Sequence, residues 1–132
     1  MQRTKITKAI LAVLTAGMIM GAVFPVAAEK HETIRLIKAL RSDNLGRRVS
    51  AAQKLAENRE VKAVKPLIRM LKNDLNYFAR FSAAVALAQI SDTKALKALK
   101  YSTRYDRNEN VRTVSGDAIF EIERLDLILA VK

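Results

Sequence analysis

The chain has 132 residues, of which 24 are Lys or Arg and 13 are Asp or Glu, so its formal net charge is +11 at pH 7. The low Gly and Pro content, with 4 and 2 residues respectively, favours an all-helical protein of one domain. The absence of Cys excludes disulfides, thiolate catalysis, Cys-ligated metals and a bacterial lipoprotein anchor.

Residues 1–28 have the layout of a secretory signal peptide. A basic start is followed by an uncharged apolar run at residues 9–24, and small residues precede a cleavage site after Ala28. We therefore expect a periplasmic or secreted protein of residues 29–132, which keeps 21 of the 24 basic residues and all 13 acidic ones, a formal charge of +8. The alternative is an uncleaved membrane anchor at residues 9–24, although a helix that spans a bilayer needs roughly 20 apolar residues.

A repeat of about 32 residues organises the rest of the chain. The motif Arg-x-Ser-Ala-Ala begins at Arg48 and again at Arg80, 32 residues later, and Arg112 follows after 32 more. Asp43 maps onto Asp74 at an offset of 31, which predicts one residue gained in the turn before Arg80. Self-similarity at this period is typical of a solenoid.

Each repeat is predicted to form two short helices. Small and apolar residues recur at helical spacing over residues 83–90, which indicates the first helix. Asp92 is expected to cap the second helix, and Glu60 holds the matching position one repeat earlier. Pro66 lies inside a second helix and predicts a kink or a delayed start. Neither helix buries its apolar face alone, so stacked pairs are expected.

The repeat resembles a known family. An Asp, then Arg-x-x-Ala-Ala-x-x-Leu, then a capped Ala-Val/Leu-x-x-Leu helix is similar to the short HEAT-like repeat of phycobilin lyases and bacterial scaffolds. The resemblance covers about residues 33–123 and implies an all-α fold, a right-handed α-solenoid of about three helical hairpins. We expect a half-repeat at 31–41, repeats at about 42–72 and 73–105, and a partial repeat at 106–132.

An Asp precedes each first helix, and an Arg follows it five or six residues later. A single catalytic site would need only one such pair, so the recurrence favours a structural role. The aspartates are expected to cap turns, and the arginines to bond to aspartates and carbonyls of adjacent turns. These structural positions are Asp43, Arg48, Asp74, Arg80, Asp106 and Arg112.

The second helices carry cations on one face, and no Asp or Glu falls within residues 61–72 or 93–105. In the resembled fold the second helices line the concave surface, so the cations should form a continuous basic patch there, with Tyr101 as an apolar anchor at one edge and Tyr105 as a second candidate for that edge. The candidate binding residues are Lys38, Arg41, Lys62, Lys65, Arg69, Lys72, Lys94, Lys97, Tyr101 and Arg104.

The basic patch has two interpretations. It is either a solvated face made of good helix formers, or an anion-binding groove, since surfaces usually mix charges of both signs. The second interpretation predicts a non-catalytic protein-interaction scaffold in the bacterial cell envelope, with an acidic protein partner. The alternative partner is an envelope polyanion, such as lipopolysaccharide, teichoic acid or phospholipid headgroups.

Catalytic, metal and nucleic-acid signals are weak. The chain has one His, His31, whereas the HEAT-like deoxyhypusine hydroxylases bind iron through several His-Glu pairs. No Gly-rich phosphate loop or Ser–His–Asp set stands out. HEAT-like DNA glycosylases handle bases with aromatic residues, but this chain lacks Trp and carries an export signal. We therefore expect no enzyme activity, no metal or other cofactor, and no nucleic-acid partner.

The last helix is predicted to start near Val111, capped by Asn108 or Asn110, and to run towards Leu129. Residues 125–132 are strongly apolar. We expect them to pack on themselves, and dimerisation through this end is the competing hypothesis.

Two further features of the first helices are predicted. Phe81 occupies a recurring apolar position and should lie in the core between repeats, with Tyr77 and Phe78 as a small exposed patch. Gly116 stands where earlier repeats have Ala, which should weaken its helix but permit closer packing.

Overall fold

The computed structural model describes residues 27–132 of the chain. The chain divides into two units, Met1–Ile34 and Arg35–Lys132. In the first unit, residues 27–34 are helical. All but the last two positions of the predicted signal peptide lie outside the described residues, so its cleavage after Ala28 stays a prediction.

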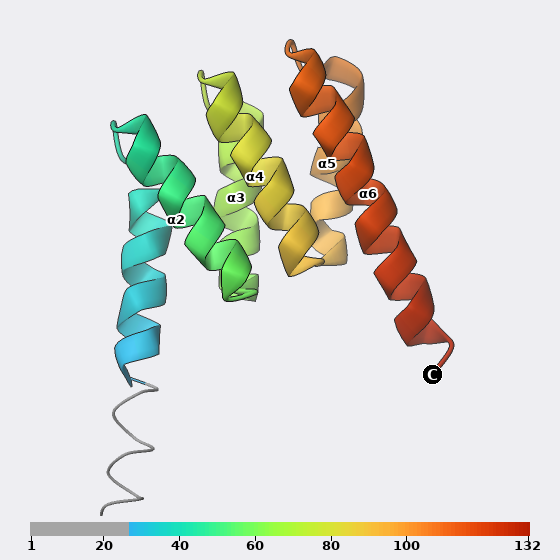
Figure 1. The fold of residues 1–132 in the computed structure, drawn as a ribbon, viewed down its shortest axis with the longest axis horizontal. Helices are drawn as coiled ribbons and strands as arrows, with labels where there is room; N and C mark the ends of the chain where they lie inside the picture. Colours follow the sequence, from blue (N-terminus) through green and yellow to red (C-terminus); the bar gives the residue numbers. More distant parts are fainter. Residues whose placement is uncertain (1–26) are drawn as a thin grey trace, which may run out of the picture. The chain divides into compact units, whose positions relative to one another are not determined.

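The second unit is built of helices. A helical segment at residues 35–39 is followed by α2 (Leu45–Glu57), α3 (Val64–Asn73), α4 (Tyr77–Ile90), α5 (Leu96–Tyr105) and α6 (Glu109–Ala130) (Figure 1). Short 3-10 turns, η1 (Val61–Ala63) and η2 (Thr93–Ala95), precede α3 and α5. The described residues contain no strand, which confirms the all-α prediction.

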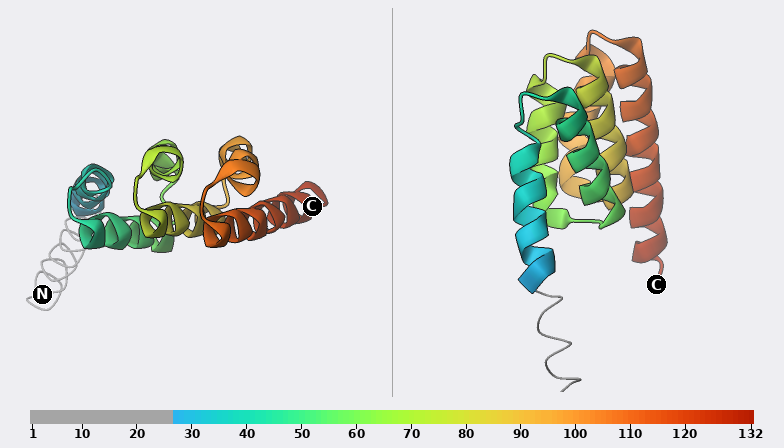
Figure 2. Two further views of the ribbon diagram at one scale, coloured as in Figure 1. Left: turned by 90° about the horizontal axis from the view of Figure 1, so that it is seen from above. Right: turned by 60° about the vertical axis from the view of Figure 1, so that its left-hand side comes forward.

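Within this unit the helices form two layers. The first helices, α2, α4 and α6, lie side by side, while the second helices, α3 and α5, lie in the other layer (Figure 2). The first helices contact one another along much of their length, whereas α3 and α5 meet only briefly. Extensive contacts also join α3 to α4 and α5 to α6. The stacking of one hairpin on the next confirms the predicted solenoid.

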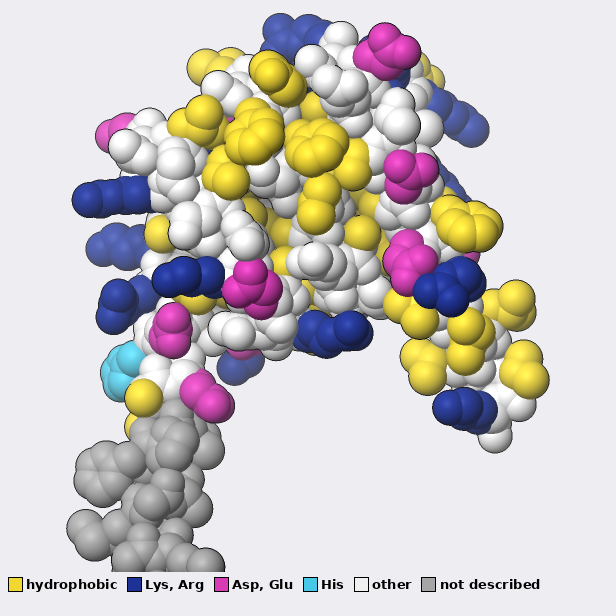
Figure 3. Space-filling model, viewed as in Figure 1, with side chains coloured by type: hydrophobic (Ala, Val, Ile, Leu, Met, Phe, Trp, Pro, Cys, Tyr) yellow, Lys and Arg dark blue, Asp and Glu magenta, His cyan; other side chains and the backbone are white. Residues whose placement is uncertain are grey.

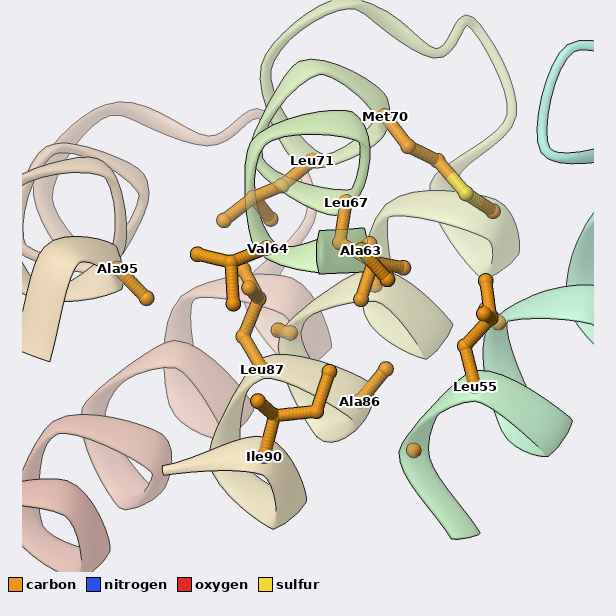
Figure 4. Packing of buried hydrophobic residues seen from close by; sticks show 14 of the residues in the cluster. Leu55, Ala63, Val64, Leu67, Met70, Leu71, Ala86, Leu87, Ile90 and Ala95 are labelled. Carbon is orange, nitrogen blue, oxygen red and sulfur yellow. The ribbon is translucent and has the colours of Figure 1, made fainter. Parts of the chain in front are cut away.

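Small residues explain the close approach of the first helices. Ala51 and Ala52 of α2, Ala83 of α4 and Ala118 of α6 are all buried, and the distance between packed helices depends on the side chains at their contact. Larger residues fill the space between the layers. Leu87 and Ile90 point from α4 towards α3, where Val64 and Leu67 lie (Figure 4).

Side chains cap the start of each segment, and the caps at Glu60, Asp92 and Asn108 were predicted from the sequence. The amide of Lys62 donates to Glu60 at 3.2 Å, and the amide of Lys94 donates to Asp92 at 2.8 Å. Asparagines cap the first helices and accept amide hydrogen bonds of 2.9 to 3.3 Å; these residues are Asn44, Asn76 and Asn108. Each capping side chain accepts a hydrogen bond from one backbone amide that has no partner within the helix itself.

A 3-10 turn delays the start of both second helices. Pro66 is the third residue of α3, where it removes an amide that has no partner within the helix. Of the two outcomes expected at Pro66, a kink or a delayed start, the delayed start is observed. However, α5 begins after the same kind of turn with Ala98 in place of the proline. The turn accommodates Pro66 and does not depend on it.

Candidate functional site

Arginine–aspartate pairs join consecutive repeats. We call this series the ladder: it consists of the pairs Arg48–Asp74 and Arg80–Asp106, together with Arg112, the next arginine at the same spacing. Arg80 makes two bonds to Asp106, from Nε to Oδ2 at 2.8 Å and from Nη2 to Oδ1 at 2.9 Å. Arg48 contacts Asp74 less regularly, with Nε 2.8 Å from Oδ2 but a well-oriented bond only from Nη2 to Oδ1 at 3.2 Å. Each ladder arginine also donates from Nη1 to the carbonyl six residues before it, at 2.8, 2.9 and 2.8 Å for Arg48, Arg80 and Arg112.

The ladder corrects the register of the first repeat. The Oδ1 atoms of the two ladder aspartates accept the amide two residues on at 2.9 Å, and Ser42 Oγ accepts the amide of Asn44 in the same way at 3.2 Å. Ser42, not Asp43, is thus the counterpart of Asp74, and no residue is gained between the repeats. The Asp43 side chain is exposed, and only its carbonyl joins the network, accepting from Arg48 at 3.2 Å.

The ladder is buried and electrically balanced. The side chains of Arg80 and Asp106 are each 7% exposed. The hydrogen bond with Asp106 raises the pKa of Arg80, which outweighs the effect of burial. Burial acts to raise the pKa of Asp106, but the bonds from Arg80 and the Asn108 amide, with the charges of Arg80 and Arg107, lower it overall. Asp106 is therefore an ionised structural partner and not a free base at neutral pH.

Two grooves open in the second-helix layer, one on each side of α3. The first groove, of about 390 Å³, lies between residues 40–43 and α3, and the second, of about 190 Å³, lies between α3 and α5. They are equivalent under the repeat, because residues 32 apart line them: Arg48 and Arg80, Pro66 and Ala98, Arg69 and Tyr101, Asp74 and Asp106. A ladder pair thus lines each groove.

Exposed cations line both grooves. Arg41 and Arg69 line the first groove, and Lys72 and Arg107 line the second. Within the described chain, none of these four residues forms an ion pair. By contrast, Lys100 on α5 pairs with Glu123 at 3.0 Å. Unpaired cations held near one another repel, and an anion in the groove relieves that repulsion.

Two tyrosines add apolar surface to the second groove. Tyr101 and Tyr105 are 58% and 64% exposed, and their ring centroids lie 4.9 Å apart. Tyr101 was predicted at one edge of the basic patch, and the ring of Tyr105 lies beside it. Arg107 was not predicted from the sequence, although the repeat offers a signal: Arg107 is the counterpart of Leu75, which lines the first groove.

All ten predicted binding residues are exposed, but only four line the grooves. These are Arg41, Arg69, Lys72 and Tyr101. The remaining six line neither groove: Lys38, Lys62, Lys65, Lys94, Lys97 and Arg104. The continuous basic patch stays a prediction, since α3 and α5 meet only briefly and these six residues lie outside both grooves.

Comparison with known families identifies the repeat. The family model described as HEAT repeats matches residues 34–119, which is well over half of the chain. The chain belongs to the HEAT-repeat family. HEAT repeats generally mediate protein–protein interactions, and proteins made of them are typically non-catalytic scaffolds. A search of curated proteins found no match to the chain.

The described part of this HEAT-repeat chain shows neither a metal cluster nor a membrane span. Between residues 27 and 132, no three His, Cys, Asp or Glu side chains are grouped so as to hold a metal ion. In the same range, no helix combines the length and the hydrophobicity needed to cross a bilayer.

The face formed by the first helices of the HEAT repeats is partly apolar. Phe81 is half-buried against the core, and its ring stacks on that of Phe78 with centroids 6.2 Å apart. Tyr77 and Phe78 are 49% and 46% exposed, as predicted. Hydrophobic side chains gather over α4 on this face, while lysines and arginines lie mostly at its edges (Figure 3).

The predicted self-packing of residues 125–132 is wrong. Helix α6 continues without a break to Ala130, and Leu127, Leu129 and Val131 are 67%, 70% and 81% exposed. A continuous helix distributes consecutive side chains around its axis, so they cannot cover one another. Hydrophobic side chains are visible at this end of α6 (Figure 3).

Proposed function

We propose that this HEAT-repeat protein is a non-catalytic scaffold that binds an acidic protein through its two second-helix grooves. The observation that carries the proposal is a repeated one: each groove combines a neutral ladder pair with exposed, unpaired cations. The ladder aspartates are already paired with arginines, so Asp43 is the one unpaired carboxylate among the residues that line the grooves, and the four exposed cations outnumber it. Arg41, Arg69 and Lys72 are the residues assigned to this contact.

The grooves favour a protein over a polyanion. Their volumes of about 390 and 190 Å³ lie near or below the low end of small-molecule pockets, roughly 300–1,000 Å³, and suit single side chains of a partner. Arg and Tyr dominate the binding energy of many protein interfaces. A polyanion held by charge alone would gain little from the exposed rings of Tyr101 and Tyr105.

Binding is tested by capture from an envelope extract on the immobilised protein. The test variant carries Arg41→Glu, Arg69→Glu and Lys72→Glu. The matched control carries Arg47→Glu, Lys54→Glu and Arg59→Glu, three exposed residues of α2 and the turn after it, so both variants change the net charge by the same amount. We expect a discrete protein to be retained at high salt by the wild type and the control, and lost by the test variant.

A second variant separates the two classes of partner. Tyr101→Ala removes an aromatic anchor without changing charge, so it should weaken capture of a protein about tenfold or more and leave polyanion binding nearly unchanged. Lipid or glycopolymer that elutes steeply with salt and ignores Tyr101→Ala would favour the polyanion. Equal capture by all variants would show that the cations are only a solvated surface.

We also propose that the protein works outside the cytoplasm, in the bacterial envelope. The support is the signal-peptide layout of residues 1–28. Fractionation of cells that make the tagged full chain should place it in the periplasm or medium, with Glu29 as its first residue. An intact amino terminus in the membrane fraction would instead indicate an anchor at residues 9–24.

A further inference from the structure

The ladder has one open position at each of its ends. Arg48 and Arg80 each reach a carboxylate 26 residues further on. Arg112, the next ladder arginine, donates to the carbonyl of Asp106, and no carboxylate within residues 27–132 pairs with it. Arg112 is partly exposed as a residue, and of its five N–H donors one is seen to bond within the described residues, from Nη1 to the Asp106 carbonyl.

The other end of the ladder offers the complementary group. Asp74 and Asp106 each receive an arginine from the preceding repeat. At the equivalent turn of the first repeat stand Ser42 and, beside it, Asp43, whose exposed carboxylate forms no ion pair within the described residues. One end of the ladder thus lacks a carboxylate, and the other has a carboxylate without an arginine.

The charges of the two ends are also opposite. Helix α6 carries five acidic and two basic residues. Residues 35–48 carry five basic residues and one acidic residue. Two α6 helices placed against each other would bring like charges together, which costs free energy, whereas α6 against residues 35–48 is attractive. The charges therefore disfavour a symmetric dimer through α6.

Helix α6 also exposes apolar surface where a following helix would cover it. In α2, Ala56 is 2% exposed, and its counterpart 64 residues later is Phe120. Phe120 is 70% exposed. A large apolar side chain at a position that stacking covers elsewhere marks a surface suited to a further layer of packing.

We propose that two copies of this chain associate head to tail, with α6 of one copy against residues 35–48 of the other and Arg112 paired with Asp43 across the contact. The contact would continue the stacking of α4 on α6 and extend the ladder by one step. A heterologous contact of this kind leaves a free end on each side, so longer arrays form as the protein concentration rises. Arg41 lies within residues 35–48, but Arg69→Glu, Lys72→Glu and Tyr101→Ala lie outside this contact, so these three substitutions test the proposed function independently of it.

The test is the mass of the full exported protein in solution, measured by sedimentation or light scattering from about 1 μM to about 1 mM. We expect the wild-type mass to rise with concentration, and Arg112→Glu or Asp43→Arg alone to weaken association about tenfold or more, because each brings like charges together. An equal mixture of the two variants should recover association, since every contact between unlike copies then pairs opposite charges.

Recovery in the mixture also shows that both variants are folded, and the helical signal of each variant is measured alongside. A wild type that stays at the mass of one chain would overturn the proposal. So would a mass that stops at two chains and is unchanged by Asp43→Arg, because that result indicates a symmetric dimer. Helical variants that fail to associate when mixed would overturn it as well.

Discussion

The turns between first and second helices place two ordinary residues in an unfavourable backbone conformation. Arg59 has φ of 48° and Ser91, its counterpart 32 residues later, has φ of 59°. The left-handed region costs a residue with a Cβ atom about 1–2 kcal/mol. Ser91 gains a hydrogen bond from its Oγ to the Ala88 carbonyl at 2.6 Å, whereas no side-chain bond is seen for the exposed Arg59.

Arg59→Gly should therefore raise the free energy of unfolding by about 1 kcal/mol, since glycine adopts positive φ without steric cost, although it also gains freedom in the unfolded chain. Thermal or urea unfolding checks the value. Arg59→Ala is the control, because it removes the same side chain but keeps the Cβ atom. If the two variants unfold alike, the φ at this turn does not limit stability.

Residue identity predicted most of the ladder but not all of it. Arg48, Arg80 and Arg112 recur at a fixed spacing, so their shared role was visible in the sequence. Ser42 was missed because Asp43 beside it is the same residue type as Asp74 and Asp106. Aligning the repeats by residue type therefore selected Asp43, although Ser42 lies at the equivalent position. Only the hydrogen bond from the Asn44 amide to the Ser42 hydroxyl shows which residue takes the place of the carboxylate.

At the scale of the helices, α6 departs most from the repeat. Gly116 stands at the place of Ala52 and Ala84, and the closer packing expected there is not needed. A Cβ atom built on Gly116 would lie 3.9 Å from the Thr103 methyl group, an ordinary van der Waals contact. The glycine therefore weakens the helix without a packing gain.

Gly116→Ala should stabilise the protein by about 1 kcal/mol, the difference in helix propensity between the two residues. For a domain of this size the melting temperature should rise by roughly 4–8 °C. Gly46→Ala in α2 is the matched control, since its Cβ atom would lie 3.2 Å from the capping oxygen of Asn44 and should gain less. A loss of stability for Gly116→Ala would mean that the contact between α5 and α6 depends on the glycine.

The elements themselves were readable from the sequence, because caps and helical spacing are local. Asp92 and Glu60 were identified as caps, and Asn108 was one of the two candidates for the cap of the last helix. The residues that line the grooves could not be predicted in the same way, because they come from different elements. Arg107 lines a groove because α3 and α5 lie on either side of it, and the relative placement of two helices is not a local property of the sequence.

Across the whole molecule, the ladder makes stability depend on the charge state of a few buried groups. Arg80 and Asp106 belong to different repeats, so their pair transmits stability from one hairpin to the next. Breaking a buried ion pair by removing one partner typically costs about 3–5 kcal/mol, because the other charge is left without compensation. Loss of this ion pair should therefore destabilise both of the repeats that it joins.

Acid should unfold the protein through this pair. The pKa of Asp106 in the folded protein lies below its usual value, so the carboxylate stabilises the fold above the unfolded pKa of about 4. That stabilisation is lost as the pH falls through the folded pKa, because the unfolded chain binds the proton more readily. We expect the free energy of unfolding to be steady from pH 7 to pH 5 and to fall below about pH 4.

Asp106→Asn should lower stability at pH 7 by about 3–5 kcal/mol and flatten its dependence on acid, since the substituted side chain does not titrate. Asp126→Asn, at the exposed far end of α6, is the control and should keep the wild-type profile. Urea titrations at pH 7, 5 and 3 give the three free energies for each protein. If Asp106→Asn loses stability in acid as steeply as the wild type, other carboxylates govern acid unfolding, and the ladder is a local contact without influence on the stacked repeats.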